Sequence, residues 1–114
     1  MKKKSAIVSP LLEEFFTEYL PHVKGLQENS IIAYQYAFQL LFRYLEDAKG
    51  LIAEKVTFDD LGGKTIEEFL LYLEQKRGCS VRTRNLRRAA IVTFAKFASN
   101  TISMQTFPQS SFYM

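Results

Sequence analysis

The chain has one cysteine, Cys79, one histidine, His22, and no tryptophan among its 114 residues. A single cysteine cannot form an internal disulfide, and one cysteine with one histidine is too few for a typical zinc site. The sequence also has no glycine-rich loop of the kind that holds phosphates, so the usual catalytic triads, metal clusters and P-loops are not expected. We therefore expect no metal, no cofactor and no small-molecule substrate.

Long apolar runs are missing as well. The longest run without a charge or an amide is only a few residues, whereas a helix that crosses a bilayer needs about 20. The basic start, Met1 to Lys4, resembles the first part of a signal peptide, but Glu13 and Glu14 fall where its apolar part would continue. These observations predict a cytoplasmic protein with no membrane partner.

Length and composition predict one folded domain. Hydrophobic residues make up 47% of the chain and charged residues 24%, which is close to the average for globular proteins. A chain of 114 residues is about the size of a single domain.

Charge is unevenly distributed along the chain, although the formal net charge is only +3. Five of the six arginines lie within residues 77–88, and no acidic residue occurs from Arg77 to Lys96. By contrast, eight of the twelve acidic residues lie between Glu46 and Glu74. One cationic segment of helical length favours an anionic partner, with a merely solubilising cationic face as the alternative.

Apolar residues recur three and four positions apart in four segments, as one face of a helix requires. The first segment runs from Leu11 to Leu20, follows a candidate cap at Ser9-Pro10, and is expected to end at Pro21. The second runs from Ile31 to about Lys49 and is expected to end at Gly50.

The other two helices are indicated by their first and last residues. A single turn opened by Thr57 is expected before the third helix. The third helix is expected to begin at a capping box over residues 65–68 and to end at Gly78. Ser80 is the expected N-cap of the fourth helix, which continues to about Ser99.

Four helices joined by short loops, each with one apolar face, can bury those faces only against one another. The fold class expected is therefore all-α, with no convincing β-alternation in the sequence. We divide the chain into a flexible basic N-terminus at residues 1–10, a helical domain at 11–99, and a tail or linker at 100–114.

The fourth helix combines its cationic side chains with an apolar face. Helical periodicity places Leu86, Ala90, Phe94 and Phe97 inward. On that assignment Arg84, Asn85 and Arg88 point outward, where they are candidates for reading base edges, and Arg82 and Arg87 lie on the flanks, where they are candidates for phosphate contact. A duplex groove accepts such a helix.

The start of the second helix carries a weaker signal of the same kind. Its polar residues could face a phosphate backbone, but an ordinary hydrated face explains them equally well. They are Lys24, Asn29, Ser30, Gln35 and Gln39.

Two stretches resemble the signatures of the N-terminal core-binding (SAM-like) domain of tyrosine recombinases, the phage-integrase family. Residues 24–34, Lys-Gly-Leu-Gln-Glu-Asn-Ser-Ile-Ile-Ala-Tyr, resemble the pattern K-G-L-S-x-x-T-x-x-x-Y, with Gln27 in place of the usual serine. Residues 77–94 resemble R-G-x-S-x-x-T-x-N-x-R-x-x-A-I-x-x-F, with Arg88 where an apolar residue is usual. Between them, residues 57–61 and 66–70 also match, so that the resemblance extends from Phe15 to Phe97.

This resemblance implies an orthogonal bundle of four to five helices that forms one half of a clamp around duplex DNA. In the family, the second and fourth helices meet the major groove at recombination half-sites during DNA integration, and other recombinase protomers join in a synaptic complex. Tyr34 has a competing role as a core aromatic residue, because it shares the face of Ile31 and Phe38. The DNA-binding residues implied by matching position are Lys24, Ser30, Tyr34, Gln35, Arg82, Thr83, Arg84, Asn85, Arg87 and Arg88.

Two alternatives use the same cationic helix. One is a stand-alone helical DNA-binding regulator or an excisionase-like accessory protein without a recombinase attached. The other is an α-helical protein-interaction module with an acidic partner. Salt-dependent binding to duplex DNA distinguishes the two DNA-binding functions from the protein-interaction module.

The 114 residues alone are expected to lack enzymatic activity. The resembling family places its catalytic arginines, histidines and nucleophilic tyrosine in a further domain, expected after about residue 105, and Tyr113 lacks the basic partners of that nucleophile. Incubation with a nicked duplex should therefore yield no covalent protein–DNA adduct in a denaturing gel, with or without divalent metal ions. An adduct traced to any tyrosine of the chain would contradict this expectation.

Overall fold

All the regular secondary-structure elements that the structure assigns within residues 6–106 are helices. The structure is a computed structural model that describes residues 6–106, with side chains up to Thr101. The elements in chain order are α1 (Ser9–Glu14), the π-helix η1 (Phe15–Val23), α2 (Glu28–Lys49), the 3₁₀ turns η2 (Ala53–Lys55) and η3 (Asp59–Leu61), α3 (Gly63–Lys76) and α4 (Val81–Thr106). The expected all-α class is confirmed. No helix within residues 6–106 has the length and apolarity required to cross a membrane.

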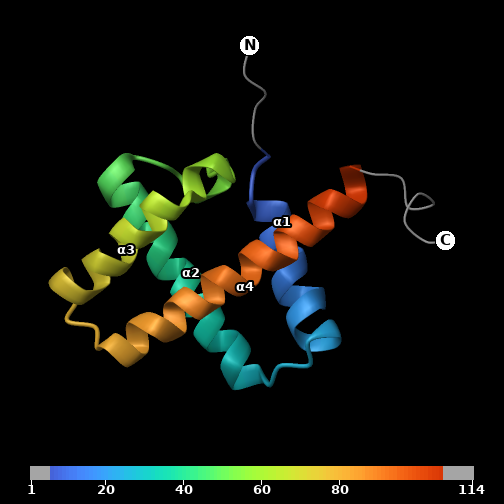
Figure 1. Ribbon diagram of the computed structural model, residues 1–114, viewed down its shortest axis with the longest axis horizontal. Helices are drawn as coiled ribbons and strands as arrows, with labels where there is room; N and C mark the ends of the chain where they lie inside the picture. Colours follow the sequence, from blue (N-terminus) through green and yellow to red (C-terminus); the bar gives the residue numbers. More distant parts are fainter. Residues whose placement is uncertain (1–5, 107–114) are drawn as a thin grey trace, which may run out of the picture.

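The helices cross rather than run parallel. Figure 1 shows α4 crossing α2, with α3 on one side of the crossing and α1 with η1 on the other. Helix α4 packs against both α2 and α3, and η1 packs against α2. An isolated antiparallel bridge between Ile7 and Thr57 joins the start of the chain to the segment before α3.

Aromatic side chains fill the crossing. Phe94 of α4 lies 5.2 Å from Phe15 of η1 and 5.5 Å from Phe38 of α2, measured between ring centroids, and both contacts are edge-to-face. Phe58, from the loop before η3, stacks on the same ring at 6.0 Å. Edge-to-face rings gain electrostatic energy in addition to the free energy of burial. One ring therefore links four separate segments of the chain.

The first helix does not end at Pro21, as the sequence pattern predicted. Pro21 lies inside η1, and the Lys24 N–H closes that segment on the Tyr19 carbonyl, five residues back. Proline has no N–H to donate, but the segment continues because Phe15 and Leu20 within it are fully buried. The expected side-chain cap at Ser9 is also absent, since the N-cap residue is Val8 and no side-chain cap bond forms there.

The capping box lies at a different threonine from the one expected. Helix α3 begins at Gly63, with Gly62 as its N-cap, so Thr65 lies inside its first turn. Instead, the Thr57 N–H donates to Asp60 Oδ2 at 2.8 Å, and the Asp60 N–H donates to Thr57 Oγ1 at 3.4 Å. The turn that Thr57 was expected to open is thus confirmed. It ends at Leu61, and α3 begins at Gly63, two residues before Thr65.

The remaining helix ends agree better with prediction. Gly50 and Gly78 follow α2 and α3 with φ of 69° and 66°, a left-handed conformation that glycine adopts without strain. Ser80 caps α4, because its Oγ accepts the Thr83 N–H at 3.1 Å. Helix α4 nevertheless continues to Thr106 rather than ending near Ser99, since no glycine or proline interrupts residues 100–106.

The folded part also begins earlier than the expected boundary at residue 11. Val8 is fully buried, and its N–H donates to the Val56 carbonyl at 2.9 Å. Residues 1–5 of the N-terminal segment and residues 107–114 of the tail lie outside the described residues.

Replacement of Phe94 by alanine should destabilise the domain severely. Phe94 is 2% exposed, and its removal leaves a cavity among Phe15, Phe38 and Phe58, which costs about 3–5 kcal/mol. Phe42→Ala is the matched control, because Phe42 is half-buried beside an open groove and should cost only about 1–2 kcal/mol. Urea unfolding followed by circular dichroism measures both, and equal losses would contradict the assignment of the core.

Candidate nucleic-acid interface

The N-terminal halves of α2 and α4 border a groove with a volume of about 440 Å³. From the crossing, these two ends separate, as Figure 1 shows. We call it the α2–α4 groove, and its lining residues are Asn29, Ser30, Ala33, Tyr34 and Tyr36 of α2 and Thr83, Leu86 and Arg87 of α4.

Leu86 corrects the inward face assigned to α4. It was expected in the core with Ala90 and Phe94, but it is 63% exposed and lines the groove. The same side of α4 is buried further along, where α2 is close. Near the start of α4 the two helices have moved apart, so that this side faces open space.

Arg87 is held at the groove by an aromatic ring. Its guanidinium carbon lies 4.9 Å from the centroid of the Tyr36 ring, which is the geometry of a cation–π contact. Arg87 is half-buried, whereas Tyr36 is exposed. No carboxylate within residues 6–106 forms an ion pair with this guanidinium.

Arg84 and Arg88 both form ion pairs with carboxylates of α3, although both were expected to point outward and only Arg88 is exposed. Arg84 Nη1 lies 3.1 Å from Glu74 Oε2, and its Nη2 donates to Asn85 Oδ1 at 3.2 Å. Arg88 Nη1 lies 2.8 Å from Glu67 Oε2. The prediction that Arg84 points outward is wrong. Arg88 is exposed, as predicted, but its guanidinium is paired with the Glu67 carboxylate. Periodicity gives the position of a residue around its own helix, but not which helix lies beside it.

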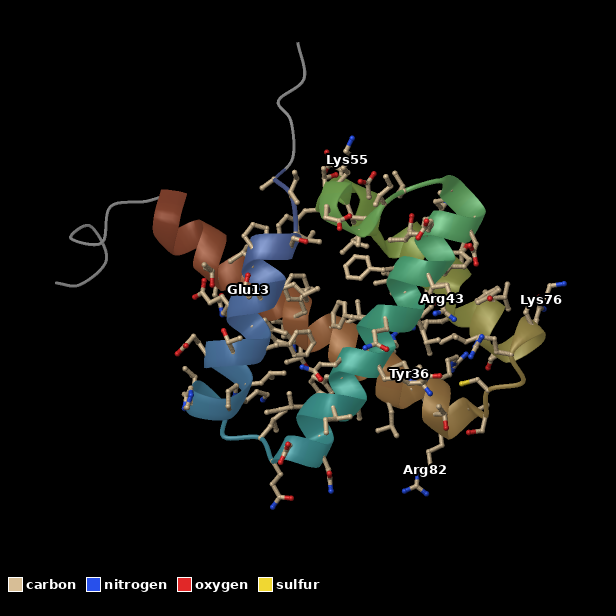
Figure 2. The ribbon with its side chains drawn as sticks, turned by 180° about the vertical axis from the view of Figure 1, so that it is seen from behind. Glu13, Tyr36, Arg43, Lys55, Lys76 and Arg82 are labelled. Carbon is tan, nitrogen blue, oxygen red and sulfur yellow. The ribbon has the colours of Figure 1, made fainter. Side chains whose placement is uncertain are left out.

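Arg82 and Asn85 form the outer surface at the start of α4, since both are exposed. Figure 2 shows Arg82 at that end of the helix, pointing away from the rest of the molecule. No carboxylate among the residues described here pairs with Arg82. Thr83 is half-buried in the groove wall, where its Oγ1 accepts a hydrogen bond from Ser80 Oγ at 3.1 Å.

The residues expected from α2 and its preceding loop are only partly brought together. Ser30 is exposed in the groove. The half-buried Tyr34 packs against the core, as its competing role required, and also lines the groove. Lys24 is exposed at the end of η1. Gln35 instead lines a second groove with Phe16 and Phe42, because it is on the opposite side of α2 from Ser30.

Sequence reasoning missed the contributions of Ala33, Tyr36 and Leu86 to the groove. Their signal was present in the spacing of Asn29, Ala33 and Tyr36, which follow the i, i+4, i+7 pattern of one helix face. All three residues are exposed, however, and the periodicity used to assign faces was that of the side chains expected in the core.

Fold and groove together define a small helical domain with a basic crossed-helix surface. The chain matches the family model of the phage integrase N-terminal SAM-like domain over residues 13–101. It is 33% identical over 96 residues to a protein of Sinorhizobium fredii named as an integrase/recombinase, y4rC, an alignment that covers 84% of this chain and 29% of that protein. It is 38% identical over 52 residues to the tyrosine recombinase XerC of Caldanaerobacter subterraneus, which covers 46% of this chain and 14% of XerC.

These matches establish the family. The chain belongs to the phage integrase N-terminal SAM-like domain family, as the resemblance of its two signatures implied. It spans less than a third of the length of either relative. No solved structure matches it significantly.

Proposed function

We propose that this chain binds duplex DNA as the core-binding domain of a tyrosine recombinase and holds a recombination half-site against α4 and the α2–α4 groove. The observation that carries the proposal is the cluster of cationic side chains at the start of α4. Arg82 and Arg87 have no carboxylate partner within residues 6–106, and Arg87 lines the α2–α4 groove together with the exposed Asn29 and Ser30 of α2.

The first turn of α4 adds to this cationic surface. A helix N-terminus carries a partial positive charge and unpaired N–H groups, both of which favour phosphate. The Ser80 hydroxyl satisfies the Thr83 N–H, and the cap leaves the N-terminus of the helix at the mouth of the groove. Arg82, in the same turn, is directed into solvent, where a DNA backbone would lie.

Base contacts in this proposal come from the outer side of α4. The major groove of B-DNA is about 12 Å wide and admits one α-helix. Asn85 is exposed one turn after the cap, and although its Oδ1 accepts from Arg84 Nη2, its Nδ2 can donate a hydrogen bond to a base edge. Arg84 and Arg88, which sequence reasoning assigned to base edges, are less suited to that role, because each is paired with an α3 carboxylate.

The recombinase role of the whole protein belongs to the same proposal. The family match and both relatives support it, since one relative is named an integrase/recombinase and the other a tyrosine recombinase. Strand cleavage, strand joining and contacts with other protomers would then involve parts of the relatives that this chain does not match. For the chain itself, the testable activity is DNA binding.

Binding to random-sequence duplex should be weak and should fall steeply with salt. Each neutralised phosphate contributes about −0.9 to the slope of log K against log salt, so two to four contacts predict a slope of about −2 to −4. Fluorescence anisotropy with a labelled duplex at several salt concentrations measures this slope. A flat response, or no binding at low salt, would exclude DNA binding by this domain and would favour the protein-interaction alternative.

Substitution of the free arginines should weaken binding without unfolding the domain. Arg82→Ala and Arg87→Ala should each reduce the magnitude of the salt slope by about one unit, on any sequence, and should change stability by no more than about 0.5–1 kcal/mol.

Lys55→Ala is the matched charge control for these two variants. Lys55 is exposed, and Figure 2 shows it at the end of the molecule opposite Arg82. Lys49 is less suitable, because its Nζ lies 3.4 Å from Glu68 Oε1. Equal losses from Lys55→Ala would mean that only net charge matters, and the proposed surface would be wrong.

A further inference from the structure

Helix α3 places two carboxylates beside two of the arginines of α4. The short turn at residues 77–80 reverses the chain, so a glutamate late in α3 meets an arginine early in α4, and an earlier glutamate meets a later arginine. Glu74 pairs with Arg84 at 3.1 Å, and Glu67 pairs with Arg88 at 2.8 Å. We call these two contacts the α3–α4 ion pairs.

Both terminal nitrogens of Arg84 are engaged. Arg84 gives Nη1 to Glu74 and Nη2 to Asn85 Oδ1, and its Nε is buried without a hydrogen-bond partner. The side chain of Arg84 is only 31% exposed and that of Glu74 only 27%. A phosphate that approached this guanidinium would have to displace the carboxylate or the amide first.

The second pair, between Arg88 and Glu67, is more exposed but shorter, and neither side chain lines the α2–α4 groove. Both pairs lie on the α3 side of α4, whereas Arg87 lies on the α2 side, over the Tyr36 ring. The arginines of α4 are thus divided by their neighbours. Two are matched by carboxylates, and two, Arg82 and Arg87, have none among the described residues.

We infer that Glu67 and Glu74 are positioning residues that limit the affinity of this domain for DNA by holding Arg88 and Arg84 away from the phosphate backbone. This inference rests on the proposed function. Each carboxylate removes one cation from the set available to phosphates and places a negative charge beside α4, where DNA would repel it. Because phosphate contacts are alike for every sequence, the effect is to weaken binding to any duplex, and binding to random DNA reports it without a contribution from base contacts.

Replacement of either glutamate by glutamine tests the inference. Glu67→Gln and Glu74→Gln keep the shape of the side chain and release one arginine each. Affinity for random duplex at about 0.1 M salt should rise about three- to tenfold for each variant, and the salt slope should steepen by up to about 0.9. If the glutamates instead orient their arginines towards DNA, the same variants should bind more weakly.

Glu68→Gln is the matched control, because it changes the net charge equally, on the same helix, and breaks the pair with Lys49 of α2 instead of a pair with α4. It should raise the affinity less than twofold. A second control removes the released cation. In Glu74→Gln/Arg84→Ala and Glu67→Gln/Arg88→Ala, the gain should disappear, although Arg84→Ala and Arg88→Ala alone should change binding by less than about twofold.

Thermal unfolding followed by circular dichroism establishes that each variant is folded, and midpoints within a few degrees of the parent are expected. Unchanged or weakened binding by both Glu→Gln variants, with salt-dependent binding by the parent intact, would overturn the inference and leave the proposed function standing. A gain from Glu68→Gln equal to theirs would overturn it as well. If neither the parent nor the variants bind duplex at low salt, the proposed function fails and the inference fails with it.

Discussion

The packing of Phe94 at the crossing of α2 and α4 is the contact on which the rest of the structure depends. Its ring lies within 5.2–6.0 Å of Phe15, Phe38 and Phe58, so that η1, α2, the loop before η3 and α4 are joined at one point. Because the two long helices touch there and cross, their N-terminal halves must separate. The α2–α4 groove is a geometric consequence of this crossing, and it places the start of α4 at the edge of the molecule (Figure 1).

The same crossing changes the role of one side of α4 along its length. Ala90 and Phe94 on that side are core residues, whereas Thr83 and Leu86, one to three turns earlier, line the groove. Meanwhile the return of the chain through residues 77–80 brings the carboxylates of α3 to the opposite flank. Neighbouring helices therefore decide which cations of α4 are paired with carboxylates, and the count of arginines alone does not show that division.

Much of the fold could be predicted from local signals. The left-handed glycines after α2 and α3 and the Ser80 cap of α4 were found where the sequence placed them, because each acts through a hydrogen bond or a backbone preference within a few residues. The failures occurred where tertiary packing outweighs a local preference. Pro21 remains within η1, in which Phe15 and Leu20 are buried. The capping box expected at Thr65 does not form, because α3 begins at Gly63.

The sequence by itself determined the helical class, the cationic segment at residues 77–88 and the family, since periodicity, charge and two signatures are properties of order along the chain. Only the tertiary structure decided that Arg84 and Arg88 meet carboxylates, that Arg87 lies on Tyr36, and that Gln35 lies on the far side of α2. The physical reason is that periodicity reports only local geometry, whereas these contacts join segments that are far apart in the sequence. A helix turns each residue by about 100°, which assigns directions, but a charge or a ring contacts whatever distant segment packing has brought within a few ångströms.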